Sequence, residues 1–429
     1  MDKEFCLLDE PWIKVLDEQN VTREVSLIDI FTNAHRYKRL AGETVTQDAA
    51  ILRLLLAVAI TVFYRYRADG CEDCVLEYDD PEEEILNRWS EYWDSGAFNA
   101  NVFQEYLETY RERFYLFHPE TPFWQVADLE DGTNYSVINL FGNIKESNNA
   151  ASRHHFHTID GSYIDNISYA EAARWIVYNN AYSVNVKTKV DGENKPTGVG
   201  RLGQLGLIIV EENTLYKIMM MNLCALNING EVWNNPKPIW EKEPRTRPGV
   251  EIVAPDNLPQ LYTIQSRRLL LYRDNEKILG YRSIGGDYYS TVDDLTEPMT
   301  LLRRDGKEKI SFKPKKHAKE IVAWREFPSL LVENELKPGI ICWLENLMHN
   351  SLIDNKQIVT FRMIGLEYGD GMSYTNGELI DEALSMSNEF LNQVGKVWIT
   401  YITDQVNKCE DVVQKAYYKF AKNLSLYLY

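Results

Sequence analysis

Three histidines within four positions are the residues of this chain whose spacing most readily suggests chemistry. They stand at 154, 155 and 157 in the stretch AASRHHFHTID, residues 150–160. On an extended strand His155 and His157 would point to one side, as a pair of zinc ligands must, while His154 would point away. No HExxH or carboxylate-rich motif accompanies them. A metal-dependent nuclease built on His154, His155 and His157 is one hypothesis that this pattern leaves open.

The neighbouring residues favour a different use of the same stretch. Arg153, His154, His155 and Phe156 place cationic or hydrogen-bonding groups beside an aromatic ring. On a loop, such side chains can contact phosphates and stack on bases. We therefore expect a loop that grips nucleic acid rather than a metal site, and we expect no cofactor.

Two other motifs carry less chemistry. Residues 198–203 match GxGxxG, but a polar loop precedes them and the β-like run Leu207–Val210 follows, which is the wrong context for a dinucleotide site. Cys71 and Cys74 form a CxxC with no second ligand pair nearby, so we do not expect a structural zinc site. With no sign of secretion, the six cysteines are expected to be free thiols in a reducing cytoplasm.

The charge is unevenly distributed. The chain has 429 residues and a net charge of −18, which argues against a protein that coats nucleic acid by bulk charge. Positive charge is nevertheless concentrated between about residues 240 and 325, with eight Lys or Arg against two acids from 303 to 319. Both a polyanion partner and a solvated basic face fit this asymmetry. The longest apolar run, Ala49–Phe63, contains Arg53 and is too short to span a bilayer, so we expect a buried helix and no membrane.

The elements that must position these residues can be outlined from the apolar spacing. Helices are expected at about 49–66 with Thr46 as its cap, from Pro81 onward, at about 101–114 and at 168–178. Residues 115–165 and 183–206 are predicted to be irregular, and 207 to about 300 to form short β-rich runs. A mostly helical tail is predicted from about Asn376. The fold class is therefore α+β: a mixed globular N-terminal body with a β-rich middle and a helical C-terminal segment.

A colinear series of short motifs makes the chain resemble a known family. The motifs are Leu7–Ile13, Ser26–Phe31, Thr46–Leu55, Pro122–Val126, Ala170–Trp175, Gln265–Arg268, Glu297–Met299 and Ala323–Arg325. No single motif is specific, but their order resembles CasA, the family of large subunits of the type I-E CRISPR Cascade complex. The resemblance spans position 7 to about 375.

The resemblance implies a non-catalytic, DNA-binding subunit rather than an enzyme. Such a subunit lies beside the 5′ end of the guide RNA, reads the protospacer-adjacent motif (PAM) in double-stranded target DNA and helps to open the duplex for R-loop formation. It also offers a docking surface to the helicase–nuclease of the system. The implied partners are the other Cascade subunits, guide RNA, target DNA and that helicase–nuclease.

The resemblance also implies roles for particular residues. A family loop near the guide's 5′ end and the PAM matches the stretch that contains Asn148, Asn149, Arg153, His154, His155 and Phe156. A second loop, which approaches the PAM, falls at about 183–188, where Asn185 and Lys187 are the expected DNA contacts although the family's glycine is absent. A basic finger that enters the minor groove falls near Arg282.

A wedge hairpin that splits the first base pairs matches Tyr368–Ser373, with Gly371, Met372 and Ser373 as its expected contacts. Some family members carry a glutamine there, whereas here the apolar Met372 would intercalate. An ordinary glycine turn, and a surface strand residue at Arg282, are the structural alternatives.

Family members end in a four-helix bundle. We expect residues 1–370 to form the α+β body that contacts DNA and guide RNA, and 376–429 to form a C-terminal helical segment with room for about two helices, an incomplete bundle. Either the chain is truncated or its bundle is reduced. A purely structural subunit is a third hypothesis, under which charge reversal at Arg282 and Lys187 would leave target binding unchanged.

Overall fold

The protein is described by a computed structural model that covers most of the chain. The described residues are 3–142, 167–244, 251–252, 255–274, 277–289, 296–305, 311–317, 323–326, 330–331, 337–373, 375–391 and 396–428. The predicted guide-RNA loop lies outside them, with all of its residues: Asn148, Asn149, Arg153, His154, His155, Phe156 and the neighbouring His157.

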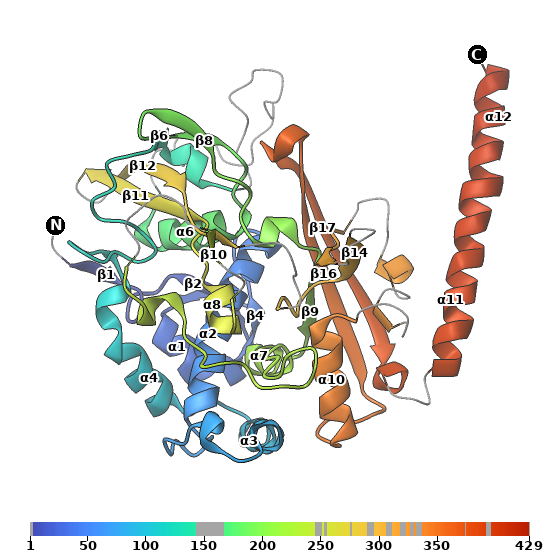
Figure 1. Ribbon diagram of the computed structural model, residues 1–429, viewed down its shortest axis with the longest axis horizontal. Helices are drawn as coiled ribbons and strands as arrows, with labels where there is room; N and C mark the ends of the chain where they lie inside the picture. The colour runs from blue at the N-terminus through green and yellow to red at the C-terminus, as the bar shows by residue number, and fades with distance from the viewer. Residues whose placement is uncertain are drawn as a thin grey trace.

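Helices and short sheets are mixed along the chain, which confirms the α+β class (Figure 1). The helices are α1 (Leu27–Asn33), α2 (Val45–Arg65), α3 (Pro81–Ser95), α4 (Ala100–Thr109), α6 (Tyr169–Tyr182), α7 (Leu215–Met221), α8 (Leu258–Tyr262), α10 (Gly339–His349), α11 (Lys396–Asp411) and α12 (Tyr418–Leu428). The strands are β1 (Glu4–Cys6), β2 (Ile13–Asp17), β3 (Thr22–Val25), β4 (Tyr37–Leu40), β5 (Tyr115–Phe117), β6 (Thr133–Ser136), β7 (Lys187–Val190), β8 (Glu193–Pro196), β9 (Leu207–Glu211), β10 (Glu251–Ile252), β11 (Arg267–Asp274), β12 (Lys277–Gly285), β13 (Tyr288–Tyr289), β14 (Leu302–Asp305), β15 (Ser311–Pro314), β16 (Ile358–Tyr368) and β17 (Thr375–Ser387).

The sheets are small. Three-stranded sheets are formed by β3–β2–β4, β11–β12–β6 and β17–β16–β9, and two-stranded ones by β1–β5, β7–β8, β10–β13 and β14–β15. Within the described residues, β10–β13 is the parallel pair and the others are antiparallel. Most of these sheets therefore build hairpins and short meanders rather than one extended surface.

Helix α2 lies in the middle of the body (Figure 1). It is apolar on all sides, and 89% of its most apolar window is buried inside the protein, although by length and composition alone the helix could cross a membrane. Such all-round burial is typical of a core helix. The predicted cap was wrong by two positions: Thr44, not Thr46, accepts the hydrogen bond from the Gln47 backbone N–H, at 3.1 Å.

The long hairpin β16–β17 replaces part of the predicted helical tail. Strand β17 runs from Thr375 to Ser387, so the prediction of a helix from Asn376 was wrong, and α11 begins at Lys396. Glu, Leu, Ala and Met in this strand are good helix formers, and they hid its period-two pattern. In that pattern Ile380 and Met386 are buried, whereas Leu379 is exposed.

Part of the predicted loop 183–206 is also a hairpin. Strands β7 and β8 pair so that Val190 lies opposite Glu193, which leaves Asp191 and Gly192 as a two-residue turn. Both turn residues have positive φ angles, 52° and 78°, as a type I′ turn requires. Asp-Gly is a strong signal for such a turn, and the sequence interpretation missed it.

The C-terminal helical prediction holds from residue 396 onward. Helices α11 and α12 continue into each other through a π-helical segment, Val412–Tyr417. Near its start the helix packs against the body through the buried Ile399, and Arg325 Nε lies 2.6 Å from a Glu410 carboxylate oxygen. The division of the chain at about residue 370 stays a prediction.

Candidate nucleic-acid interface

An open groove with a volume of about 800 Å³ lies where several of the predicted DNA-contacting segments meet. The residues that line it are Asn185, Gly198, Val199, Gln204, Arg303, Lys313, Pro314, Lys315, Lys316, Gly371 and Met372. Four of these described residues are basic and none is acidic. Three stretches that are far apart in the sequence therefore form one surface, and that surface suits a polyanion.

The turn between β16 and β17 brings the predicted wedge residues to this groove. Gly371 and Met372 have φ angles of 61° and 55°, and the Met372 side chain is 44% exposed. A left-handed conformation is ordinary for glycine but costs a residue with a side chain about 1 kcal/mol or more. The turn thus holds an exposed apolar side chain in an unfavourable backbone conformation, and such strain is often found at functional sites.

Asn185 holds the turn from the opposite wall. Its backbone N–H donates to the Met372 carbonyl oxygen at 2.8 Å, and its Nδ2 donates to the Gly371 carbonyl oxygen at 3.4 Å. Its Oδ1 accepts from the Gly198 N–H at 3.1 Å. The predicted DNA contact Asn185 therefore uses its amide to join two loops to the wedge turn.

The other predicted residues of these loops lie around the groove rather than in it. Ser373 follows Met372 in the turn and is half-buried. Lys187 is exposed at the start of β7, opposite Pro196, and does not line the groove.

The hairpin β14–β15 supplies two of the four basic residues of the groove, Arg303 and Lys313, and the other two follow directly after it. Arg303 lies directly opposite Lys313 in its register, and like charges in such a cross-strand pair are destabilising. An anion bound between them would relieve this repulsion. Arg303 is exposed, whereas Lys315 is 2.7 Å from a carboxylate oxygen of the buried Glu326.

Lys316 extends the basic edge to the wedge hairpin. Its ammonium lies 5.1 Å from the centre of the Tyr368 ring, and desolvation lowers the pKa of Lys316. The Tyr368 hydroxyl in turn donates to the Tyr182 carbonyl oxygen at 2.7 Å, which anchors the base of the hairpin to the end of α6. Tyr368 therefore contacts the Lys316 ammonium and also fixes the base of the hairpin that carries Met372.

Arg282, the predicted minor-groove finger, lies in the middle of β12. Its Nη1 donates to the carbonyl oxygens of Leu129 and Glu130 at 2.9 and 2.8 Å, and its Nε donates to Asn134 Oδ1 at 3.0 Å. The guanidinium is half-buried and does not line the groove. These contacts favour the structural alternative, while the DNA-contacting role stays a prediction.

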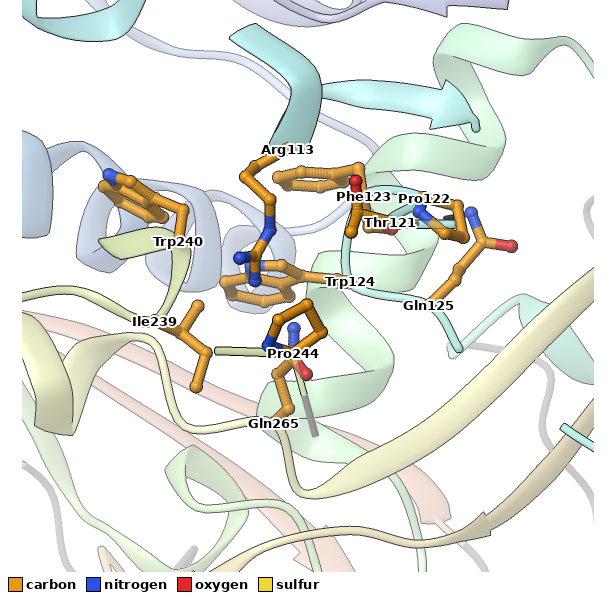
Figure 2. A pocket seen from close by; sticks show the side chains of 10 residues that line it. All are labelled: Arg113, Thr121, Pro122, Phe123, Trp124, Gln125, Ile239, Trp240, Pro244 and Gln265. Atoms are coloured by element: carbon orange, nitrogen blue, oxygen red, sulfur yellow. Dashed lines mark hydrogen bonds between the residues drawn. The ribbon is translucent and has the colours of Figure 1, made fainter. Parts of the chain in front are cut away.

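A second cavity lies around the Pro122–Val126 motif, where the Arg113 side chain points toward the ring of Trp124 (Figure 2). Its volume is about 30 Å³, and Arg113 Nη1 donates to the Lys242 carbonyl oxygen at 2.8 Å. A cavity of this size holds a water molecule or two but no base. It is therefore a packing feature rather than a nucleic-acid site.

The glycine motif at 198–203 was set aside in the sequence interpretation, but it forms part of the groove wall. Gly198 has a φ of 71° and lines the groove. A Cβ at Gly200 would lie 2.5 Å from the Ala181 backbone, and one at Gly203 would lie 2.0 Å from the Tyr368 hydroxyl. The spacing marks close backbone packing, and this signal could have located the wall.

Comparisons with known proteins agree with the sequence resemblance. The model of the family "CRISPR-associated protein Cse1" matches residues 7–426. The CasA/Cse1 protein of Thermus thermophilus is 28% identical over 338 residues, which are 77% of this chain and 60% of that protein. The chain thus spans less than two thirds of the length of this relative.

Solved structures show the same fold. The crystal structure of Thermobifida fusca Cse1 superposes with a TM-score of 0.82 at 26% identity, over 96% of this chain and 79% of that one. A chain of a CRISPR RNA-guided surveillance complex gives a TM-score of 0.68 at 17% identity, over 90% of this chain and 76% of that one. Because the family model matches almost the whole length, this chain belongs to the Cse1 family of CRISPR-associated proteins.

Proposed function

We propose that the protein is the non-catalytic large subunit of a type I-E Cascade complex in the cytoplasm. In this role it recognises the PAM in double-stranded target DNA, helps to open the duplex for R-loop formation and offers a docking surface to the helicase–nuclease. Its partners are the other Cascade subunits, guide RNA and target DNA. The observation that carries the proposal is the basic groove into which an exposed, strained Met372 projects.

The groove divides the work between two kinds of side chain. Arg303 and Lys316 contact phosphates and hold the duplex, and they supply affinity without reading sequence. Met372 enters the base stack as an apolar wedge, at a cost of a few kcal/mol of unstacking that the phosphate contacts offset. Met372 replaces a polar wedge residue of some relatives, so its contribution is shape and apolar contact rather than a hydrogen bond.

The experiment measures duplex binding by the guide-loaded complex, with and without this chain, at one fixed salt concentration. A library with a randomised flank beside the protospacer first identifies the preferred PAM from the bound fraction. Binding is then compared on targets with the preferred and a scrambled flank. We expect tight binding only with this chain and the preferred flank.

Two variants connect the result to the groove. Met372→Gly should weaken binding to the paired target, while Met372→Gln, which restores a long side chain, should retain most of it. If the scrambled flank binds equally well, PAM recognition is wrong and a structural or recruiting role is the better interpretation. If the chain binds zinc or manganese and a cleavage activity is lost when His154, His155 and His157 are replaced, the nuclease hypothesis replaces this one.

A further inference from the structure

Arg267 is buried beneath the groove wall in an unusual environment. It is 3% exposed, and its guanidinium donates to five main-chain carbonyl oxygens of three short segments. These acceptors are Ser183 at 3.5 Å, Val184 at 2.9 Å, Thr197 at 3.3 Å, Gly198 at 2.7 Å and Ser266 at 2.7 Å. Within the described part of the chain, no carboxylate lies within ion-pair distance of Arg267.

The next residue on the same strand is different. Arg268 is 1% exposed, and its Nη2 lies 2.5 Å from a carboxylate oxygen of the buried Asp287. A buried cation normally has such a counter-ion, because its desolvation is otherwise costly. Burial lowers the pKa of Arg267 to about 10, which leaves it charged at neutral pH. The buried charge of Arg267 is therefore stabilised by hydrogen bonds to main-chain carbonyls and not by a carboxylate of the described residues.

Those hydrogen bonds lead directly to the wedge turn. Two of the acceptors, Ser183 and Val184, immediately precede Asn185, and two others, Thr197 and Gly198, form the segment to which Asn185 Oδ1 is bonded. Asn185 in turn holds the Met372 carbonyl oxygen. A continuous series of contacts thus runs from the buried guanidinium to the exposed methionine.

We propose that Arg267 is the positioning residue of the wedge turn: it gathers the carbonyls of both loops and, through Asn185, sets where Met372 stands in the groove. The inference rests on the proposed function. A planar guanidinium has five N–H donors in a fixed fork, whereas a lysine ammonium has three donors at one point. Arg267→Lys therefore keeps the charge and loses the geometry.

The test compares Arg267→Lys with Arg268→Lys, its equally buried neighbour, in the guide-loaded complex. Each complex is titrated with two DNA duplexes. One is fully paired, and the other has mismatches between its two strands beside the PAM, so that its first base pairs are already open. We expect Arg267→Lys to weaken binding to the paired target on the order of tenfold, the effect of one or two lost hydrogen bonds to a charged group. Binding to the pre-opened target should stay within about twofold of the wild type.

Arg268→Lys should lower thermal stability without changing the ratio of the two affinities. If both variants weaken both targets alike, Arg267 only supports the fold and the inference is overturned. Should Arg267→Lys fail to enter the complex, Asn185→Ala removes the side-chain hydrogen bonds to Gly198 and Gly371 that tie the second loop to the wedge turn, and it keeps the backbone bond to Met372. An unchanged ratio of the two affinities in that variant overturns the inference as well. A wild-type complex that ignores the PAM would instead reject the proposed function, so the two failures are distinguishable.

Discussion

In the sheet β11–β12–β6, arginines direct their guanidinium groups to oxygen atoms of the same chain, as Arg268 does to Asp287 and Arg282 does to two carbonyls of the 129–130 segment. In the hairpin β14–β15, by contrast, Arg303 and Lys313 lie opposite each other along an open groove. The basic residues of both regions belong to the same part of the sequence, between about residues 240 and 325.

A count of basic residues does not show which of them have their hydrogen bonds satisfied within the protein. A cation whose hydrogen bonds are satisfied inside the protein has little left to offer a phosphate, and removing it damages the fold. An exposed cation with other cations nearby, such as Arg303, gains free energy when an anion arrives. The first kind should govern stability and the second kind DNA binding, with Arg267 as the proposed exception that is buried and also positions the wedge turn. Each of the following changes tests one side of this division.

The largest effect is expected when the buried pair in the sheet is broken. Asp287→Asn removes the carboxylate that lies 2.5 Å from the Arg268 guanidinium, in a site where both groups are 1% exposed. The free energy of unfolding should fall by about 3–5 kcal/mol. Urea denaturation followed by tryptophan fluorescence measures it, and a loss below about 1 kcal/mol would show that the pair is not needed.

A large effect on DNA binding, without one on stability, is expected in the groove. Arg303→Gln combined with Lys316→Gln removes two of the proposed phosphate contacts, so the slope of log affinity against log salt should become shallower by about two. The free energy of unfolding should stay within about 0.5 kcal/mol of the wild type. Arg303 is exposed, and its replacement also removes a positive charge that lies opposite Lys313. An unchanged slope would remove these residues from the DNA interface.

A smaller effect, and only on stability, is expected at Arg282. Arg282→Gln loses hydrogen bonds to the carbonyls of Leu129 and Glu130 and should destabilise the protein by about 1–2 kcal/mol. Affinity for target DNA should stay within about twofold. If the salt slope instead falls by about one, the predicted minor-groove finger is correct and the division between the two regions fails at this residue.

The smallest effect is a pH dependence that belongs to Lys316. Since desolvation lowers its pKa, this ammonium is charged at neutral pH and loses its proton at a lower pH than an ordinary lysine. DNA affinity of the wild type should therefore decline at constant salt as pH rises toward the ordinary lysine pKa of about 10.4. The Lys316→Gln variant should be flat over this range, and a parallel decline in both would assign the titration to another group.

Helices with local signals were the predictable part of the fold. Helix α3 begins at Pro81 after Asp80, whose side chain accepts from the Glu83 N–H, and it ends at Gly96 with a φ of 69°. Each of these features can be read from neighbouring residues, because capping involves only one turn of chain. The hairpins were less predictable, since helix-forming residues in β17 and polar residues in β7 and β8 obscured their alternation.

The residues of the candidate site could be predicted only where they lie together in a single segment of the sequence. The family resemblance placed the predicted wedge in the single segment Tyr368–Ser373. The cross-strand pair of Arg303 and Lys313 instead depends on a strand register that the sequence does not reveal. The partner of Arg282 on β6 is 148 residues away in the sequence. The partners of Arg267 are main-chain atoms, which no residue type marks.

That use of the main chain has an evolutionary consequence. Every amino acid supplies the same carbonyl oxygen, so a frame built on carbonyls does not depend on which side chains the two loops carry. Under the proposed function, substitutions of exposed or half-buried residues such as Val186, Lys187 and Gln204 can change what faces the DNA while Arg267 continues to hold the loops in place. A lineage that meets a different flanking sequence can thus explore new recognition surfaces by single substitutions, without rebuilding the scaffold beneath them.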